Sequence, residues 1–321
     1  TYFRMKVIEH IEQAQDTLIS FEILPPLKGK SIDSIYSHLD LLMDFKPAFI
    51  NVTYHRSEYM FKKRGDGTFE KAEVRKRPGT VGICAAIMNH YKIDAVPHLI
   101  CGGFSREETE NALIDLNFLG IDNVLVLRGD APKNETFFEP EPDGHRYAVD
   151  LLGQVVNMNK GHYLEEDLLD GLKTDFCIGV AGYPEKHFEA PNMESDLCHL
   201  KEKVAKGAHY ITTQMFFDNK KFFAFVEKCR AAGIEAPIIP GLKPITNKKQ
   251  LTILPHIFHV DIPNELSDEI LKCKTDKDVE QVGTEWLIQQ SRELKAYGVP
   301  VLHYYTLGKP TAIRNAVKEI V

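Results

Sequence analysis

The sequence lacks the features that mark a secreted, membrane-spanning or disulfide-stabilised protein. No apolar run approaches the roughly 18 residues that a membrane span needs, and the N-terminus has no charged-then-apolar signal pattern. The six cysteines lie far apart and form no Cys-x-x-Cys pair, so neither a zinc ribbon nor a redox motif is predicted. We therefore expect a cytoplasmic protein without a membrane partner.

Excess positive charge is also missing from the chain as a whole. Its 321 residues include 39 Lys or Arg and 46 Asp or Glu, which gives a net charge of -7. A general nucleic-acid surface needs clustered basic residues that displace phosphate counterions. We therefore expect small-molecule substrates and no nucleic-acid partner.

Several familiar catalytic motifs are absent. There is neither a Gly-x-Gly-x-x-Gly after the first predicted strand nor a P-loop, so a Rossmann dinucleotide site and a nucleotide triphosphate site are not supported. No His-Glu-x-x-His motif occurs, and the close pair His256 and His259 is more typical of a surface than of a metal site. A Gly-x-Ser-x-Gly elbow for acyl transfer is missing too. No metal is predicted, and acid/base chemistry by carboxylates with an organic cofactor remains.

Eight short apolar or β-branched runs are predicted to be strands, and most are apolar on both faces, as parallel strands covered by helices are. They lie at 18–24, 48–54, 95–101, 123–128, 177–183, 210–217, 237–242 and 301–307. Amphipathic stretches fill the gaps at 31–45, 79–91, 105–119, 147–159, 194–206, 219–232 and 278–297. This order predicts an α/β protein, a (β/α)8 TIM barrel, with a doubly wound sheet as the main alternative.

No linker or repeat divides the chain, so a single domain over residues 5–321 is the simpler interpretation. Residues 1–4 precede Met5 and are interpreted as a remnant of recombinant expression outside the fold. The least regular segment, 54–78, holds eight Lys or Arg against four acids. It is either a solvated excursion after the second strand or a grip for an anionic ligand tail.

Polar residues stand at the ends of most predicted strands, where barrels and doubly wound sheets build their active sites. Glu22 is the most conspicuous, because an unpaired carboxylate inside an apolar strand is costly to bury. Each residue also has a purely structural explanation, such as a core salt bridge for Glu22 or a hydrogen-bonded core histidine for His98. Their coincidence at one end of one sheet favours a catalytic site. The group comprises Glu22, Thr53, His98, Asp130, Tyr183, His187, Gln214 and Tyr305.

Six motifs, in order along the chain, resemble those of the methylenetetrahydrofolate reductases. The resemblance runs from about Leu18 to Thr306, and the motifs together are specific although each alone is weak. They are Ser20-Phe21-Glu22 with Pro25-Pro26, Asn51-Val52-Thr53-Tyr54, Pro97-His98-Leu99, Leu127-Arg128-Gly129-Asp130, Ala181-Gly182-Tyr183-Pro184-Glu185-Lys186-His187 and Thr213-Gln214-Met215-Phe216-Phe217-Asp218.

The resemblance implies an oxidoreductase of one-carbon metabolism and methionine biosynthesis. Such an enzyme holds FAD in a TIM barrel, takes hydride from NADH or NADPH and passes it to 5,10-methylenetetrahydrofolate, giving 5-methyltetrahydrofolate. Glu22 matches the general acid that protonates N10 of the folate, and we expect its apolar strand to raise its pKa. Asp130 matches a carboxylate beside flavin and folate, and Gln214 a residue that hydrogen-bonds the pterin.

The resemblance also assigns binding residues. The folate-binding set is Glu22, Asp130, Gln214, Gln250 and Lys309, where Lys309 replaces an arginine that can meet the glutamate tail. His199, Glu202 and Leu254 also depart from the bacterial pattern. The flavin-binding set is Thr53, His98, Arg128, Gly129, Asp130, Tyr147, Ala148, Tyr183, His187, Ala190, Asp196 and Lys203.

Family resemblance further suggests a homo-oligomer. The chain ends soon after the eighth predicted strand, so it resembles the catalytic module alone, and control by S-adenosylmethionine is not expected. Two alternatives stay open: a Schiff-base aldolase of the same fold with Lys243 as the amine, and a flavin- or folate-binding barrel without turnover.

Overall fold

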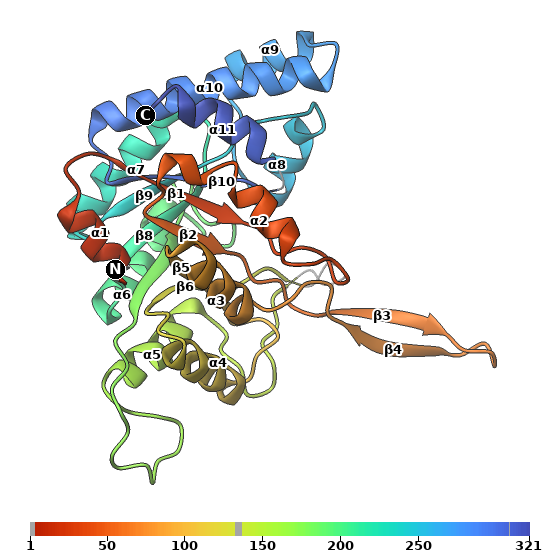
Figure 1. Ribbon diagram of the computed structural model, residues 1–321, viewed down its shortest axis with the longest axis vertical. Helices are drawn as coiled ribbons and strands as arrows, with labels where there is room; N and C mark the ends of the chain where they lie inside the picture. The colour runs from red at the N-terminus through yellow and green to blue at the C-terminus, as the bar shows by residue number, and fades with distance from the viewer. Residues whose placement is uncertain (1–3, 132–136, 308) are drawn as a thin grey trace.

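Eight parallel strands close into a barrel in the order β1-β10-β9-β8-β7-β6-β5-β2 (Figure 1). This computed structural model describes residues 4–131, 137–307 and 309–321, so residues 1–3 of the expected N-terminal remnant lie outside the described residues. The predicted (β/α)8 barrel is confirmed, and because the sheet closes, the doubly wound alternative is wrong. The strands are β1 (Leu18–Ile23), β2 (Phe49–Val52), β5 (Asp94–Ile100), β6 (Asn123–Leu127), β7 (Cys177–Gly182), β8 (Tyr210–Met215), β9 (Ile238–Leu242) and β10 (Val301–Tyr305).

Helices on the outside of the barrel correspond to the predicted amphipathic stretches. The first of these stretches is shorter than expected, because its helix ends at Leu39 and a separate 3-10 turn, η1 (Met43–Phe45), follows. In α4, Ser105 and Glu108 form the predicted capping box, with the Glu108 amide 3.1 Å from Ser105 Oγ. These helices are α2 (Asp33–Leu39), α3 (Thr80–Tyr91), α4 (Arg106–Phe118), α5 (Ala148–Asn159), α6 (Met193–Lys206), α7 (Asn219–Ala231) and α10 (Asp276–Tyr297).

Four further helices are not predicted by the strand-and-helix pattern: α1 (Val7–Gln13), α8 (Gln250–Phe258), α9 (Asn264–Lys272) and α11 (Pro310–Lys318). The helix α1 closes the N-terminal end of the barrel. Val7 is fully buried in a cluster with residues at the amino ends of the strands, such as Phe49 and Tyr210. Its amide donates to Asn123 Oδ1 at 2.8 Å. With seven residues, α1 is too short for a helical period to be evident in the sequence.

Segment 54–78 is a solvent-exposed excursion after β2, as one of the two interpretations expects, but it has regular structure that the sequence does not predict. Strands β3 (Glu58–Lys63) and β4 (Phe69–Val74) pair as an antiparallel hairpin, with Glu58 opposite Val74 and Lys63 opposite Phe69. In Figure 1 this hairpin projects away from the barrel. The sequence does not reveal this hairpin, because charged residues interrupt both strands.

The barrel interior changes character along its axis. Near the amino ends of the strands it is apolar, filled by residues such as Phe49, Val96, Leu125 and Ile239. Nearer the carboxyl ends, buried polar residues appear, including Glu22 and His98. In barrels of this kind, the carboxyl end is where active sites lie.

A glycine of α10 tests how tightly the outer layer packs. A Cβ on Gly283 would overlap the backbone carbonyl of Ile245, whereas a Cβ on Gly82 of α3 would meet no atom within 4 Å. Gly283→Ala should therefore lower the free energy of unfolding by about 1–3 kcal/mol, although alanine favours helices. Gly82→Ala should be neutral or stabilising by up to about 1 kcal/mol. Urea unfolding measures the free energy of unfolding of both variants. Equal changes would contradict the close contact between Gly283 and Ile245.

Candidate active site

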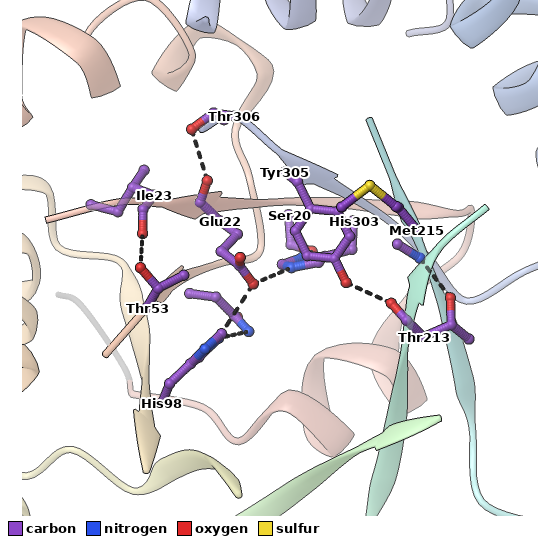
Figure 2. A network of polar contacts seen from close by, with 12 residues as sticks. Ser20, Glu22, Ile23, Thr53, His98, Thr213, Met215, His303, Tyr305 and Thr306 are labelled. Carbon is purple, nitrogen blue, oxygen red and sulfur yellow. Dashed lines mark hydrogen bonds and ion pairs between the residues drawn. The ribbon is translucent and has the colours of Figure 1, made fainter. Parts of the chain in front are cut away.

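A buried carboxylate, Glu22, occupies the mouth of the barrel. It lies on β1 opposite Asn51 of β2 and Tyr305 of β10, and its side chain points into the barrel (Figure 2). Its backbone carbonyl accepts from the Thr306 hydroxyl at 2.8 Å, which fixes this end of the strand. Only 6% of the residue is exposed. A negative charge so buried requires partners.

Two histidines from distant strands provide those partners. His98 Nε2 of β5 lies 3.3 Å from Glu22 Oε2, and His303 Nε2 of β10 lies 3.5 Å from the same oxygen. His303 is fully buried, and its Nδ1 lies 2.7 Å from the hydroxyl oxygen of Ser20. The ring of Phe49 is parallel to that of His303, at 6.5 Å. We call Ser20, Glu22, His98 and His303 the Glu22 cluster.

The two histidines reverse the direction in which the pKa of Glu22 is expected to shift. Burial raises that pKa, but the two nearby imidazoles, His98 first and His303 second, outweigh it and lower the pKa of Glu22 to about 2. The expectation of a raised pKa is therefore wrong: it rested on the apolar sequence around Glu22 and took no account of imidazoles from other strands. A proton held here belongs to the cluster rather than to the carboxyl alone.

Tyr305 of β10 and Gly241 of β9 extend the mouth beside Glu22, because β10 pairs with β1 and β9 pairs with β10. The Tyr305 hydroxyl donates to the Thr213 carbonyl of β8 at 2.5 Å, and its ring meets that of His303 edge-on at 5.3 Å. A Cβ on Gly241 would overlap the Tyr305 hydroxyl, so glycine makes room for this bond. Burial raises the pKa of Tyr305 well above its ordinary value, which keeps the phenol neutral.

Thr53 and Asp130 border the cluster on the side of β2 and β6. The Thr53 hydroxyl lies 3.3 Å from Nε2 of His55, a residue that the sequence does not single out. Burial lowers the pKa of His55, and the charges of Arg77 and His98 lower it further, against the weaker opposite effect of Asp130 and Glu22. Asp130 is exposed, and it follows Gly129, whose φ of +83° is a backbone conformation that favours glycine.

Arg128 joins the loops after β6 and β7. Its guanidinium binds both carboxylate oxygens of Glu189, with Nη2 2.9 Å from Oε1, and it stacks over the Phe138 ring at 5.0 Å. This pairing lowers the pKa of Glu189. The predicted flavin residue Arg128 is therefore held in place, with the Nη1 and Nη2 edge of its guanidinium already bound to a carboxylate.

The remaining predicted flavin residues form a second polar group around β7 and α6. The Tyr183 and His187 rings meet edge-on at 4.7 Å, and the His187 amide donates to Asp196 at 2.9 Å. The ammonium of Lys203 donates to the Ala181 carbonyl at 2.9 Å. Burial lowers the pKa of Lys203 to about 8, against the effect of Asp196. Ala190 is buried beside this group.

Tyr147 and Ala148 form the N-cap and the first residue of α5. The start of a helix presents free backbone N–H groups that suit phosphate. The Tyr147 amide already donates to Asp150 at 3.2 Å, and the Tyr147 side chain is exposed.

The predicted folate residues are less closely grouped. Gln214 Oε1 accepts from the Met215 amide at 2.9 Å, and Gln250 Oε1 accepts from the Thr246 amide at 2.6 Å, so both carboxamides are occupied by local backbone. Lys309 is exposed at the start of α11. Within the described residues, no contact joins these three to Glu22.

Lys243, the amine of the aldolase alternative, follows β9 and is buried. Burial and the charge of Lys309 lower its pKa to about 8. Over the described residues, no group of three or more His, Cys, Asp or Glu could hold a metal ion, and no helix is long and apolar enough to cross a membrane.

Comparison with known proteins places the chain in a family. Residues 6–321 match the family model described as methylenetetrahydrofolate reductase. The chain belongs to the methylenetetrahydrofolate reductase family. Methylenetetrahydrofolate reductase 1 of Schizosaccharomyces pombe is 32% identical over 313 residues, 97% of this chain and 47% of that protein. The chain thus spans about half the length of that curated relative.

A bacterial methylenetetrahydrofolate reductase is covered more fully. The 5,10-methylenetetrahydrofolate reductase of Pectobacterium carotovorum is 31% identical over 292 residues, 91% of this chain and 86% of that protein. A solved structure, an uncharacterised protein from Clostridium thermocellum that binds two copies of 5-methyl-5,6,7,8-tetrahydrofolic acid, superposes with a TM-score of 0.57 at 14% identity. That alignment covers 98% of this chain and 97% of the other, and it shows a shared fold.

The lowered pKa of Glu22 predicts how acid affects stability. A carboxyl whose pKa falls on folding stabilises the folded state above its ordinary value of 4.5, and this contribution is lost as the pH falls towards about 2. The difference in free energy of unfolding between wild type and Glu22→Gln should therefore shrink over that range. Urea unfolding at several pH values measures it.

Glu185 provides a matched control, because burial raises its pKa. Its ionised form costs stability, so the difference between wild type and Glu185→Gln should move in the opposite direction as the pH falls. The same pH trend for both variants would contradict the assignment of the Glu22 pKa.

Proposed function

We propose that this protein reduces 5,10-methylenetetrahydrofolate to 5-methyltetrahydrofolate with hydride from NADH or NADPH, transferred through FAD. Membership of the family supports the reaction. The observation that assigns the reaction to particular residues is the buried carboxylate of Glu22 between the imidazoles of His98 and His303, at the mouth of the barrel. The five-membered ring of methylenetetrahydrofolate, which contains N5 and N10, opens only when N10 is protonated. The Glu22 cluster would supply that proton.

The donor groups beyond the cluster suit FAD. Bound FAD would supply the hydride-carrying ring system. Arg128 and Lys203 are cations near the ends of β6 and β7 and suit a pyrophosphate, and the start of α5 adds backbone donors. Thr53, His98, Gly129, Tyr183, His187, Ala190 and Asp196 would line the remainder.

Within the cluster, Glu22 is the proposed catalytic acid, and His98 and His303 are proposed to relay a proton to it. Since its pKa is about 2, the carboxyl of Glu22 is an anion near neutral pH and needs a proton source. Delivery of a proton to N10 therefore draws on His98 or His303, which pass a proton to Glu22 as the substrate covers the mouth. Ser20 keeps His303 oriented through Nδ1.

Asp130 and Gln214 are proposed to contact the pterin. The exposed carboxylate of Asp130 favours positive charge that develops on the substrate. Gln214 would have to release the Met215 amide to reach the pterin, and Gln250 the Thr246 amide. Lys309, beside Lys243, gives the glutamate tail a positive partner.

The wider biological expectations are part of this proposal. One-carbon metabolism and methionine synthesis would be the setting, in the cytoplasm. Residues 5–321 would act as one catalytic unit.

The first test of the reaction is the flavin spectrum of the protein. Protein supplied with FAD should bind it, bleach with NADH under anaerobic conditions and recover with methylenetetrahydrofolate. Glu22→Gln should leave bleaching by NADH largely unchanged and slow recovery with folate by about 10²–10⁴-fold, the usual contribution of a general acid. Equal losses in both half-reactions would overturn the acid assignment, and failure to bind FAD would overturn the reaction.

A second test concerns His303. His303→Asn removes one of the groups that lower the pKa of Glu22, so the carboxyl should stay protonated to a higher pH than in wild type. Infrared difference spectra show this as a protonated carboxyl band that is absent from Glu22→Gln. Folate reduction should slow while reduction by NADH does not.

The histidine His209, whose Nδ1 accepts from the Ile178 amide near the amino ends of the strands, supplies the control. His209→Asn should leave the carboxyl band unchanged. If His303→Asn leaves it unchanged as well, His303 is only a packing residue.

The aldolase alternative can be tested at Lys243, the amine that would form the Schiff base. A buried lysine with a pKa of about 8 is more nucleophilic than an ordinary one. Borohydride trapping of a carbonyl substrate on Lys243, with no flavin uptake, would favour that reaction.

A further inference from the structure

Lys243 is a buried cation at the mouth of the barrel, and only 5% of the residue is exposed. Side chains of a strand alternate between its two faces, and the inward face of β9 holds Ile239 and Gly241. Ile239 belongs to the apolar interior, and a Cβ on Gly241 would meet the Tyr305 hydroxyl. Lys243 comes two residues after Gly241, and the proline that follows it favours an extended backbone. The Lys243 side chain is therefore directed into the mouth.

The charge of Lys243 has no protein partner within the described residues. No hydrogen bond or ion pair joins its ammonium to them, and the charged group that acts on it is a second cation, Lys309. Burial and the charge of Lys309 lower the pKa of Lys243 to about 8, so the ammonium is still mostly protonated near neutral pH. Lysines are almost never buried unless they are paired, because an unpaired buried charge destabilises the folded state. This arrangement indicates that an anion from outside the chain completes the pair.

Two lysines at one place suit an anion with about two negative charges. Lys309 begins α11, just after β10, and β10 pairs with β9, so both lysines follow neighbouring strands. A phosphate monoester carries about 1.5 to 2 negative charges near neutral pH, and a lysine binds it as a point charge. A single carboxylate carries one charge, for which the exposed Lys309 is enough. The additional charge of Lys243 therefore favours a phosphate monoester.

One of the two hydride donors carries such a group. NADPH has a phosphate monoester on the 2′-oxygen of its adenosine ribose, where NADH has a hydroxyl group. Rossmann domains distinguish the two with a residue that follows their glycine motif. This chain has no Gly-x-Gly-x-x-Gly motif, so the 2′-position must be recognised by other groups.

We propose that Lys243 and Lys309 form a site for the 2′-phosphate of NADPH, which makes NADPH the preferred hydride donor of this protein. This inference rests on the proposed function, because it concerns the dinucleotide that reduces the flavin. Lys243 supplies a buried charge, whose attraction for phosphate is stronger than that of a charge in water. Lys309 supplies an exposed charge that neutralises the remainder of the phosphate. Both are specificity-determining residues, since they act on a group that only one donor has.

Anaerobic reduction of the FAD-loaded protein by each donor tests this preference. The apparent Kd of wild type should be at least about tenfold lower for NADPH than for NADH, the usual effect of one charge-assisted contact. Lys243→Met keeps an unbranched side chain without the charge, so it should weaken binding of NADPH and remove most of the difference. Binding of NADH and the limiting rate of flavin reduction should stay unchanged. The matched control is Lys318→Met, which removes the same charge from the exposed end of α11 and should leave the preference intact.

Calorimetry measures the site without hydride transfer. Wild type should bind adenosine 2′,5′-bisphosphate more tightly than adenosine 5′-monophosphate, and Lys243→Met should abolish the difference. Urea unfolding of the same variant checks the premise, because removing an unpaired buried charge should raise the midpoint of unfolding. A lower midpoint would mean that the ammonium stabilises the folded protein through a partner of its own, and would overturn the proposal.

Three further results would overturn the proposal. Wild type that binds both donors equally well would do so, as would a Lys243→Met variant that retains the preference for NADPH. A variant with unchanged preference but weaker binding of methylenetetrahydrofolate would assign Lys243 to the glutamate tail instead. Failure of both donors to reduce bound FAD would contradict the proposed function, and calorimetry with the two adenosine phosphates would still decide whether the phosphate site exists.

Discussion

A carboxylate inside the barrel is the constraint on which the site depends. Glu22 projects from β1 into a barrel that is apolar towards the amino ends of its strands, and among the described residues the imidazoles of His98 and His303 lie against its carboxylate. The three side chains come from β1, β5 and β10, so their contact exists only when the sheet closes. The closed sheet thus determines the electrostatics of the mouth, and the electrostatics in turn determine where a proton can be held.

Much of the fold follows from the sequence, because parallel strands covered by helices on one side and by the barrel core on the other are apolar on both faces. All eight strand positions are predicted within a few residues. The additional helices and the hairpin are not. Val7 of α1 is buried by residues from several strands, and β3 and β4 gain no core that would give them an alternating pattern. Tertiary contacts, rather than local pattern, define these elements.

The site is predictable in position and less so in chemistry. Glu22 and His98 are conspicuous polar residues in apolar strands, and they do meet. His303 escapes notice and Ser20 appears only as part of a motif, although their alternation with Tyr305 and Glu22 marks an inward polar face on β10 and β1. The sign of the pKa shift of Glu22 depends on that pairing. A sequence window around Glu22 contains none of the groups that lower its pKa.

The pairing of β1 with β10 has a consequence for how the molecule is made. The strand that carries Glu22 leaves the ribosome among the first, and the strand that carries His303 among the last of those in the barrel. Contacts between such distant segments form slowly, because a long loop must close before they do. Until β10 is made, the barrel cannot close, so Glu22 lacks His303 and the edges of β1 and β9 have no partner strand. Unpaired strand edges of this kind favour aggregation.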